Sequence, residues 1–453
     1  MSSKKVAGAS TSKKSQTREQ DAPTSLMPKL RFPEFREAKG WEETQLQKIA
    51  RPVADRAVTG DGDNILSLSN EHGIVLQSDY FGKKIAGDSA ERYLKLLRND
   101  FVYNDRTTKA STFGTIKRLS KYDGGIVSPI YKCFRFHADE NPVFWEWYFE
   151  SGSHDAVLGG LVNEGARAGR FNISISQFLS TAAWRPDEPE QQKIAECVSS
   201  VDELMAVQAR KVDALKTHKK GLMQQLFPRE GEAQPLLRFP EFQNAGEWVE
   251  KTFGEIVAVA SGQVDPTKPP YCDFPQIGSE NIESNTGKLV NVKSAGDKGV
   301  ISGNYVFDEN DVLYSKIRPA LNKVAAPAFK GICSADIYPI RPANGGLHRS
   351  YLMYLLLSQK FLEYAIRNSE RGKIPKINRD GLLTYAVLIP SVAEQKRIAS
   401  CITTLDDLIA AQTHKHEALK THKKGLMQQL FPGSADVPVG RGNHPNDAEV
   451  DGE

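Results

Sequence analysis

The sequence predicts an α+β protein in which two similar mixed α/β globular domains are joined by two long helices. We expect these helices to pair as an antiparallel coiled coil and the two halves to be related by a pseudo-twofold internal repeat. Three observations support this prediction: a long exact duplication, two stretches with a heptad period, and two unlike inserts of similar length between the duplicated segments.

The duplication is the strongest signal in the chain. The fourteen-residue sequence LKTHKKGLMQQLFP occurs at Leu215–Pro228 and again, unchanged, at Leu419–Pro432. EQQKIA at Glu190–Ala195 matches EQKRIA at Glu394–Ala399 with the same offset, and LRFPEF at Leu30–Phe35 recurs at Leu237–Phe242. Identity over fourteen residues does not arise by chance, so the chain contains two copies of one ancestral unit.

The repeat divides the chain into predicted segments. We expect disordered tails at both ends, because these regions are rich in Ser, Lys, Gly and Asp and poor in apolar residues. Between the tails, two globular domains with their opening segments alternate with two helices. The predicted bounds are 1–27 for the N-terminal tail, 28–187 for the first domain, 188–228 for the first helix, 229–391 for the second domain, 392–432 for the second helix and 433–453 for the C-terminal tail.

The two helices are predicted from an apolar spacing that alternates between three and four residues over more than four heptads, which is the period of a coiled coil. Prolines bracket both stretches and none interrupts them. Each helix, at roughly 1.5 Å per residue, spans roughly 55–60 Å. The seam positions are Ile194, Val198, Val201, Met205, Gln208, Val212, Leu215, Leu222 and Leu226 in the first helix, and Ile398, Ile402, Leu405, Ile409, Gln412, Leu419, Leu426 and Leu430 in the second.

Polar residues at matching seam positions, Gln208 with Gln412 and Lys219 with Lys423, are typical of helices whose register and partner are specified. The alternative is that these residues are exposed on two loosely amphipathic helices. We favour pairing within the chain, since the duplication supplies a matched pair. The domains would then lie at opposite ends of a rigid spacer.

The inserts, at about residues 50–187 and 257–391, share only weak sequence similarity. Leu66 corresponds to Ile277, and Tyr103 to Tyr314, at one common offset. β-rich runs at Gly124–Phe136 and Asn304–Ile317 precede helical runs at Asn141–Ser151 and His348–Ser369, whose aromatic residues we expect in the core. Similar folds with different surfaces indicate two different ligands, or two readings of one ligand.

Composition limits the class of protein. The chain has 453 residues, 40 % hydrophobic and 25 % charged, with a net charge of only +3, so any binding to nucleic acid must rely on local charge. Its five cysteines are widely spaced and form no C-x-x-C, which predicts neither disulfides nor zinc. The longest apolar run, Leu352–Leu357, is far too short to span a bilayer. We expect a cytoplasmic protein.

Basic and polar residues gather in predicted loops of both inserts. Arg can bind guanine through two hydrogen bonds, Asn can do the same with adenine, and Lys neutralises phosphate, so these loops are candidates for binding DNA. Most loops of this kind are only solvated surface, but their matching placement in both halves favours a role. The candidates are Asn104, Arg106, Thr107, Lys109, Lys117, Arg118, Arg167 and Arg170 in the first insert, and Ser279, Asn281, Ser315, Lys316, Arg318, Arg371, Lys373 and Lys376 in the second.

Motifs for catalysis are weak. Asn141-Pro142-Val143-Phe144 is one residue away from the Asn/Asp-Pro-Pro-aromatic loop of an adenine methyltransferase, but no glycine-rich cofactor loop accompanies it. Asn141 and Pro142 are better explained as the cap and first residue of a helix. No phosphate-binding G-x-x-x-x-G-K-[ST] motif occurs, and the nine histidines suggest no metal cluster. We expect neither a catalytic residue nor a cofactor nor a metal.

The order of these parts resembles the specificity subunit of a Type I restriction–modification system. The residues that carry the resemblance are the duplicated EQ-x-x-IA openings, the helices ending in KKGLMQQLFP, the RFPEF segments, and IGSENI and DVLYSKIRP in the second insert. It covers about residues 28–432 and is weaker in the first insert.

The resemblance implies two target-recognition domains, each of which reads one half of a bipartite double-stranded DNA target. It also implies two partner methyltransferase subunits that modify adenine with S-adenosylmethionine on a base turned out of the stack, and ATP-dependent restriction subunits. Two other functions remain open: a stand-alone DNA-binding protein and a coiled-coil assembly scaffold. A scaffold would not need two unlike, loop-rich inserts.

Overall fold

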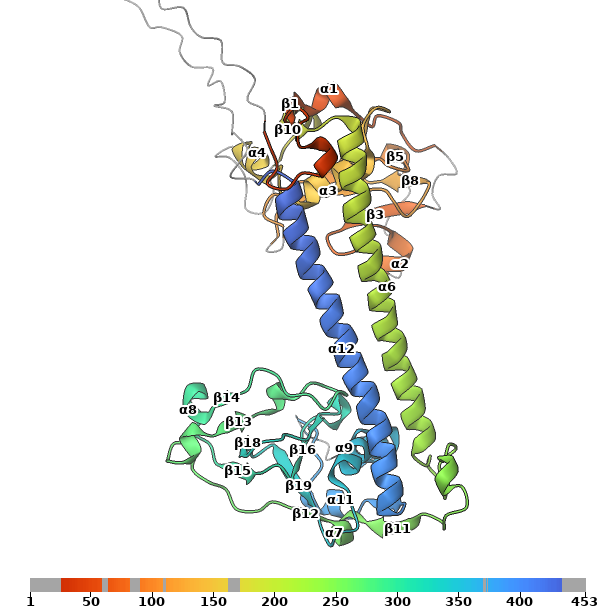
Figure 1. Ribbon diagram of the computed structural model, residues 1–453, viewed down its shortest axis with the longest axis vertical. Helices are drawn as coiled ribbons and strands as arrows, with labels where there is room; N and C mark the ends of the chain where they lie inside the picture. Colours follow the sequence, from red (N-terminus) through yellow and green to blue (C-terminus); the bar gives the residue numbers. More distant parts are fainter. Residues whose placement is uncertain are drawn as a thin grey trace, which may run out of the picture. The chain divides into compact units, whose positions relative to one another are not determined.

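The computed structural model describes residues 26–58, 64–81, 90–108, 111–161, 172–369, 372 and 374–433 (Figure 1). The chain divides into two compact units. Unit 1 comprises Met1–Ala206 with Glu417–Glu453, and unit 2 comprises Val207–His416. Each unit therefore contains one of the two inserts together with part of each long helix.

Unit 1 is built on two four-stranded sheets and a two-stranded ribbon. Two long-range pairings, β1 with β10 and β2 with β9, bring the start of the domain against its end. The first sheet has the order β2 (Ala50–Pro52), β9 (Lys132–Phe136), β6 (Phe101–Asn104) and β7 (Thr115–Arg118). The second has the order β4 (Gly73–Leu76), β3 (Ile65–Ser69), β8 (Gly124–Val127) and β5 (Leu94–Leu97), and the ribbon pairs β1 (Glu42–Gln45) with β10 (Ala182–Arg185).

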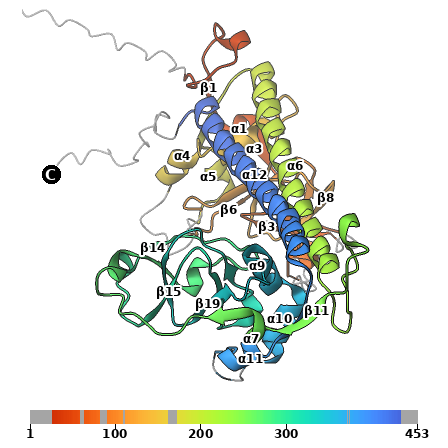
Figure 2. The ribbon, with the colours of Figure 1, turned by 60° about the horizontal axis from the view of Figure 1, so that its bottom comes forward.

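Unit 2 repeats this arrangement strand for strand. Its sheets have the orders β12 (Val257–Val259), β19 (Ile337–Pro342), β16 (Val312–Ser315), β17 (Val324–Ala325), and β14 (Lys293–Ser294), β13 (Pro275–Ile277), β18 (Gly331–Ser334), β15 (Asn304–Phe307). The ribbon pairs β11 (Val249–Thr252) with β20 (Ala386–Ile389). Figure 2 shows β19 beside α9 in this unit. The shared strand order confirms the predicted internal repeat.

The weak sequence similarity corresponds to equivalent positions. Leu66 and Ile277 are each paired with the parallel strand of their sheet, opposite Val127 and Cys333 respectively. Tyr103 and Tyr314 occupy the same place in β6 and β16, and both are buried. The β-rich runs Gly124–Phe136 and Asn304–Ile317 each form two strands, but those strands belong to different sheets.

Short helices connect the sheets. In unit 1 they are α1 (Leu46–Ile49), α2 (Gln77–Phe81), α3 (Pro142–Glu150), α4 (Asp155–Gly160) and α5 (Ile175–Leu179), with 3-10 turns η1 (Pro33–Phe35) and η3 (Ala90–Arg92). In unit 2 they are α7 (Phe253–Ile256), α8 (Ala295–Lys298), α9 (Arg349–Leu357), α10 (Gln359–Arg367) and α11 (Arg379–Leu383), with η4 (Pro240–Phe242), η5 (Tyr271–Asp273), η6 (Ser279–Asn281) and η7 (Pro319–Leu321).

Two details of these helices test the sequence analysis. Asn141 caps α3 as expected: its Oδ1 accepts hydrogen bonds from the amides of Val143 (2.9 Å) and Phe144 (3.1 Å), and Pro142 is the first helical residue. The run His348–Ser369, which we expected to be one helical stretch, contains two helices. Ser358 ends α9 and caps α10, accepting from the amide of Phe361 at 3.3 Å.

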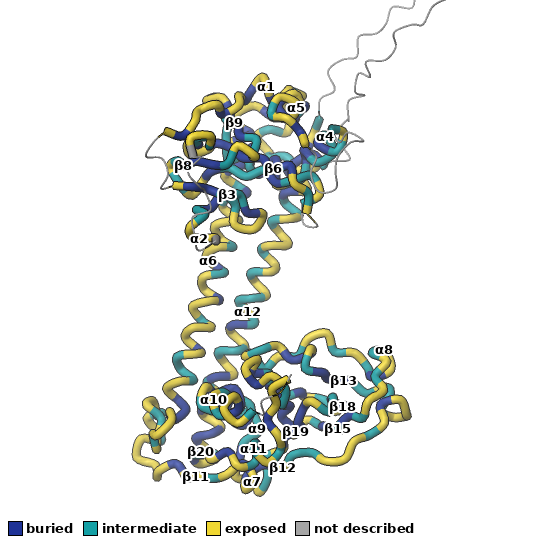
Figure 3. The backbone as a smooth tube through the Cα atoms, turned by 180° about the vertical axis from the view of Figure 1, so that it is seen from behind, coloured by how far each residue is buried: buried dark blue, intermediate teal, exposed yellow. Residues whose placement is uncertain are grey.

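The long helices are α6 (Glu188–Leu226) and α12 (Val392–Leu430). In each unit a stretch of one lies antiparallel to a stretch of the other (Figures 1 and 2). Gln208 on α6 donates to the side chain of Gln412 on α12 at 2.9 Å in unit 2, and Lys423 pairs with Asp202 in unit 1. All the predicted seam residues are buried or partly buried (Figure 3).

The C-terminal ends of both helices lie in domain cores. In unit 1 the end of α12 supplies Leu430 and Phe431 to a core that contains Trp41, and the amide of Leu30 donates to the carbonyl of Gln429 at 2.9 Å. In unit 2 the end of α6 does the same, and Phe227 stacks on Tyr351 with ring centroids 5.4 Å apart. This double packing explains why the duplicated LMQQLFP segments remain identical.

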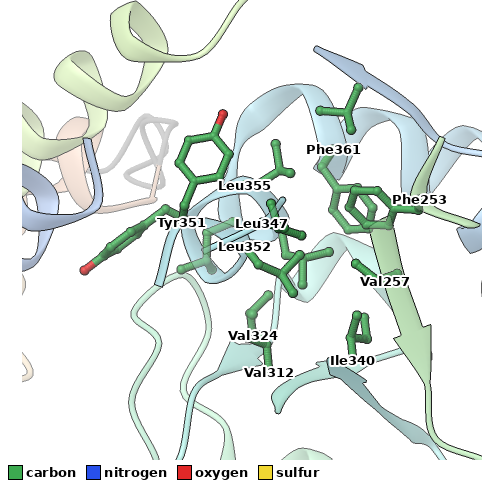
Figure 4. Packing of buried hydrophobic residues seen from close by; sticks show 14 of the residues in the cluster. Phe253, Val257, Val312, Val324, Ile340, Leu347, Tyr351, Leu352, Leu355 and Phe361 are labelled. Atoms are coloured by element: carbon green, nitrogen blue, oxygen red, sulfur yellow. The ribbon is translucent and has the colours of Figure 1, made fainter. Parts of the chain in front are cut away.

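The core of unit 2 is shown in Figure 4. Phe253 stacks on Phe361 with ring centroids 5.7 Å apart, and Val312, Val324 and Ile340 from the neighbouring sheet lie in the same cluster. The aromatic residues of α3, α9 and α10 are in these cores, as the sequence predicted. Burial of such side chains stabilises each domain by roughly 25 cal/mol per Å² of apolar surface.

An arginine in each RFPEF segment connects the domain to its helix. Arg31 makes two hydrogen bonds to Glu190 in unit 1, at 2.8 and 2.6 Å. Arg238 makes the same two bonds to Glu394 in unit 2, both at 2.8 Å. The carboxylates are almost fully buried. The repeated RFPEF and EQ-x-x-IA motifs are therefore partners, and they hold domain and helix together.

Candidate nucleic-acid interface

The candidate interface of unit 2 lies where two segments meet beyond the end of β16. The amide of Arg318 donates to the carbonyl of Pro375 at 2.7 Å, and the amide of Ile377 donates to the carbonyl of Lys316 at 3.0 Å. Ile317 and Lys376 form an isolated antiparallel bridge. These contacts bring Lys316, Arg318 and Lys376 together, and we call these three residues the basic loop of unit 2.

Arg318 is held in an unusual backbone conformation. Its φ of 48° and ψ of 60° lie in the left-handed region, which residues other than glycine seldom adopt. Pro319 follows at the start of η7, and the amide of Leu321 donates back to the Arg318 carbonyl at 2.9 Å. The side chain is exposed. The fold thus holds a strained backbone that presents a guanidinium to solvent.

The ring of Tyr338 packs against the basic loop through a cation–π contact with Lys316. The Lys316 ammonium lies 5.1 Å from the centre of its ring, and the Arg379 guanidinium lies 5.8 Å from it. Arg379 also donates to the carbonyl of Val259 at 3.0 Å and to that of Ala260 at 2.5 Å. Arg379 and Tyr338 were not among the predicted site residues, because their places depend on contacts far apart in the sequence.

Three other predicted residues of unit 2 are engaged within the fold. The hydroxyls of Ser279 and Ser315 lie 2.9 Å apart, and Ser315 is buried. Asn281 is 3 % exposed. Its Nδ2 donates to the carbonyls of Val290 and Asn291 at 2.9 and 3.0 Å, and its Oδ1 accepts from the amide of Gly278 at 2.9 Å. Ser315 and Asn281 therefore make hydrogen bonds within the fold, and their predicted contact with DNA stays a prediction.

In unit 1 the equivalent position is the end of β6. Asn104 is partly buried, and its Oδ1 accepts from the amide of Arg106 at 3.2 Å. Arg106 is exposed and Thr107 is partly buried, so both can reach a ligand. The predicted residues Lys109, Arg167, Arg170, Arg371 and Lys373 lie outside the described residues.

We had expected Lys117 and Arg118 to lie in a loop, but they do not. Both are in strand β7, and their side chains bind acidic residues of α3. Lys117 pairs with Glu150 at 2.5 Å and Arg118 with Glu146 at 2.6 Å. Burial raises the pKa of Glu146 despite its Arg118 partner. These two cations therefore attach the strand to the helix, and their predicted contact with DNA stays a prediction.

A polar cavity of about 370 Å³ lies at the β6–β7 connection of unit 1. Its lining includes the predicted residue Lys117 and several residues that sequence reasoning did not single out, among them Asn70, Ser111 and Thr115. The Thr115 hydroxyl lies 2.5 Å from Asn70 Oδ1 and 3.2 Å from the Ser111 hydroxyl. The cavity therefore offers neutral donors and acceptors, of the kind that can bind base edges, beside the Lys117–Glu150 ion pair and Asp155.

Across the described ranges there is no group of three or more His, Cys, Asp or Glu residues that could hold a metal ion. In the same ranges no helix has the length and apolar character needed to cross a membrane.

Comparison with known proteins gives consistent results. Residues 245–421 match the family described as the Type I restriction modification DNA specificity domain. The chain is 31 % identical over 182 residues to the Type I restriction enzyme EcoDI specificity subunit of Escherichia coli, a match that covers 40 % of this chain and 39 % of that protein. It is 26 % identical over 191 residues to the HindI specificity subunit of Haemophilus influenzae, covering 41 % of each. These matches span less than half the length of either relative.

Two solved structures share the fold at low sequence identity. The S subunit of a Type I restriction–modification system from M. genitalium aligns with a TM-score of 0.55 and 14 % identity, over 90 % of this chain and all of that one. A chain from a study of complex assembly and conformational transition in the type I R-M system aligns with a TM-score of 0.53 and 17 % identity, over 87 % and 98 % of the two chains. The predicted fold class is confirmed.

Proposed function

Because residues 245–421 match the Type I restriction modification DNA specificity domain family, we propose that this chain is the specificity subunit of a Type I restriction–modification complex. It binds a bipartite double-stranded DNA target, with one half read by each unit, and it has no chemistry of its own. The observation that carries the proposal is the repeated frame with unlike surfaces at equivalent strand ends. One frame explains a common assembly, and unlike surfaces explain two half-sites.

The proposed contacts in unit 2 are those of the basic loop, Lys316, Arg318 and Lys376, joined by Ser279 at its edge. An exposed guanidinium can form two hydrogen bonds with guanine, and the lysines can neutralise phosphates. In unit 1 the proposed contacts are Asn104, Arg106 and Thr107, with the polar cavity beside them. The predicted residues Lys109, Arg167, Arg170, Arg371 and Lys373 extend these surfaces in our proposal.

The partners follow from the same proposal. Two methyltransferase subunits, which use S-adenosylmethionine to modify adenine, dock on this chain, and ATP-dependent restriction subunits complete the complex. Only one chain is needed to specify both halves of the target, since both readers lie on it. The paired helices α6 and α12 set the number of base pairs between the half-sites, and the complex acts in the cytoplasm.

Selection from random DNA tests this function. The full-length chain, purified with its methyltransferase partner, is incubated with a library of random duplexes, and the bound molecules are sequenced. We expect two short, different half-site sequences (below, words) separated by a fixed number of unspecified base pairs. Enrichment of a single continuous word, or of no word, would refute a bipartite reader.

Helix length provides a second test. Adding seven residues to both α6 and α12 at equivalent positions keeps the seam in register, since a heptad is two turns of the coiled coil. We expect the same two words with a longer gap between them, or loss of selection. The same words with an unchanged gap would show that the helices do not set the spacing.

A further inference from the structure

A cavity of about 600 Å³ in unit 2 lies away from the basic loop, between the long helices and the domain. Its lining includes Lys216 and Lys220 of α6, Ile409 of α12, and the loop of residues 283–288 that follows η6. The proposed contacts with bases do not involve this cavity. Any ligand that it binds must therefore be inferred from the residues that line it.

The exposed charged residues of the lining are mainly lysines, with Glu283 as the one exposed carboxylate among the lining residues. Lys216, Lys220 and Lys288 are exposed, and none of them is paired with a carboxylate in the part of the chain that the structure describes. Lys219 differs, because it is 8 % exposed and bound to both oxygens of Asp406 at 2.6 and 2.8 Å. Lys216 and Lys220 are four residues apart, and therefore lie on one face of α6.

The segment between β16 and β17 connects the cavity to the basic loop. Asn322, which lines the cavity, ends the same short connection that begins with Lys316 and Arg318. Its Nδ2 donates to Asn285 Oδ1 at 3.0 Å, and its carbonyl accepts from the Asn285 amide at 3.0 Å. The segment between β16 and β17 thus contributes both to the basic loop and to the lining of the cavity.

The lining does not present the anchors of a protein-docking groove. Met223, Leu357, Leu362 and Ile409 are buried or partly buried, and none of the lining residues is among the exposed large hydrophobic residues of the described chain. Protein interfaces usually depend on large apolar or aromatic groups at their centre. Exposed ammonium groups around a polar mouth fit a polyanion better.

The duplication indicates what kind of polyanion fits. Lys216 and Lys220 recur unchanged as Lys420 and Lys424, whereas the residues of the base-reading loops differ between the halves. A ligand that binds next to both half-sites and is chemically the same at each would favour this pattern. The phosphate backbone of DNA has this property, because it does not vary with base sequence.

We propose that Lys216, Lys220 and Lys288 bind DNA backbone phosphates beside the half-site that unit 2 reads, so that helix α6 is itself part of the DNA-binding surface. The proposal rests on the proposed function. These lysines contribute affinity but do not distinguish one sequence from another.

The test compares salt dependence in a triple variant with Lys216, Lys220 and Lys288 each changed to Ala. The full-length variant, purified with its methyltransferase partner, is titrated with the duplex selected above and with an unrelated duplex of equal length, at several salt concentrations. The slope of log affinity against log salt should become shallower by about 0.9 for each lysine–phosphate pair that the substitutions remove. Affinity for both duplexes should fall by the same factor, roughly eightfold per pair at 0.1 M salt.

A matched control is Lys211→Ala. Lys211 is also exposed on α6, but it is nine residues from Lys220 and so lies on the opposite face. It should leave the slope unchanged, which separates a local interaction from a general loss of positive charge. Each single lysine variant should give a proportionate part of the triple effect.

Different failures have different meanings. If wild type selects its duplex and the triple variant keeps the wild-type slope, the phosphate contacts are refuted and the proposed function stands. Loss of the methyltransferase partner from the triple variant with an unchanged slope would also refute them, and would identify a protein-docking site. If wild type prefers no duplex, the proposed function itself fails, and this inference fails with it.

Discussion

The ends of strands β6 and β16 are equivalent places in the two units, but their charges are used differently. In unit 1, Lys132 lies across from Tyr103 and pairs with Asp105, which is buried, at 2.7 Å. In unit 2 the corresponding pair of positions holds Tyr338 and Lys316, which form a cation–π contact at 5.1 Å. Unit 1 therefore has an internal ion pair, Lys132 with Asp105, at the place where unit 2 has the Lys316 ammonium over the ring of Tyr338.

This difference suggests how one frame can read two sequences. In unit 1 the cations of β7 and β9 are bound to carboxylates of the same unit, and the nearby cavity is lined by amides and hydroxyls together with the Lys117–Glu150 ion pair and Asp155. In unit 2, Arg318 is exposed at the corresponding place. We therefore expect unit 2 to depend mainly on the charged contacts of the basic loop, and unit 1 to combine the exposed Arg106 with neutral hydrogen bonds from Asn104, Thr107 and the cavity.

Two equivalent lysines of the helix pair, Lys219, which is buried, and Lys423, which is partly buried, provide the sharpest stability comparison. Asp406 is 22 % exposed and binds both Lys219 and the hydroxyl of Tyr354, whereas Asp202 is 51 % exposed. Asp406→Ala would leave the buried Lys219 unpaired, at a cost of about 3 kcal/mol or more. Asp202→Ala should cost about 1 kcal/mol or less. Urea unfolding followed by circular dichroism compares them, and equal losses would show that burial does not distinguish the two pairs.

Acid should destabilise unit 1 through one histidine. Burial lowers the pKa of His154 to about 3, while the same position in unit 2 is Phe361. The unfolded chain binds a proton near pH 6.5 and the folded unit does not, so stability is complete above this pH and falls as the pH drops toward 3. The loss should reach about 2 kcal/mol at pH 5.

His154→Phe should remove this part of the acid dependence, and it keeps the hydrogen bond from the Thr181 hydroxyl to the Phe178 carbonyl. Urea unfolding at pH 7 and pH 5 measures the difference. An identical pH dependence in the variant and the wild type would show that another group controls acid stability.

One arginine variant and one lysine variant test which cations bind DNA and which bind carboxylates within the fold. Arg318→Ala should lower the preference for the selected duplex by about 1 kcal/mol or more, if its guanidinium binds a base. Lys117→Ala should lower this preference less than Arg318→Ala, because the Lys117 ammonium is already paired with Glu150, and it should also weaken the packing of β7 against α3. Competition binding at fixed salt gives both values. A larger loss of selectivity for Lys117→Ala than for Arg318→Ala would reverse our assignment.

Sequence reasoning was most successful where the evidence was local or duplicated. The long helices, the cap at Asn141 and the equivalence of Tyr103 with Tyr314 all depend on spacing or repetition, which a single sequence displays. It could not show that Lys117 and Arg118 bind α3, because Glu146 and Glu150 lie about thirty residues away. Nor could it show that the end of α12 completes the core of unit 1, or that Tyr338 supports Lys316.

The central claim is that two unlike readers occupy one repeated frame, and a chimera tests it most directly. Residues 50–187 are replaced by the equivalent residues 257–391 of the same chain, and DNA selection is repeated with the purified complex. We predict that both bound words become the one that unit 2 reads, arranged as an inverted repeat, with the spacing unchanged. Recovery of the original pair of unlike words would contradict the account, because the inserts would then not determine the half-sites.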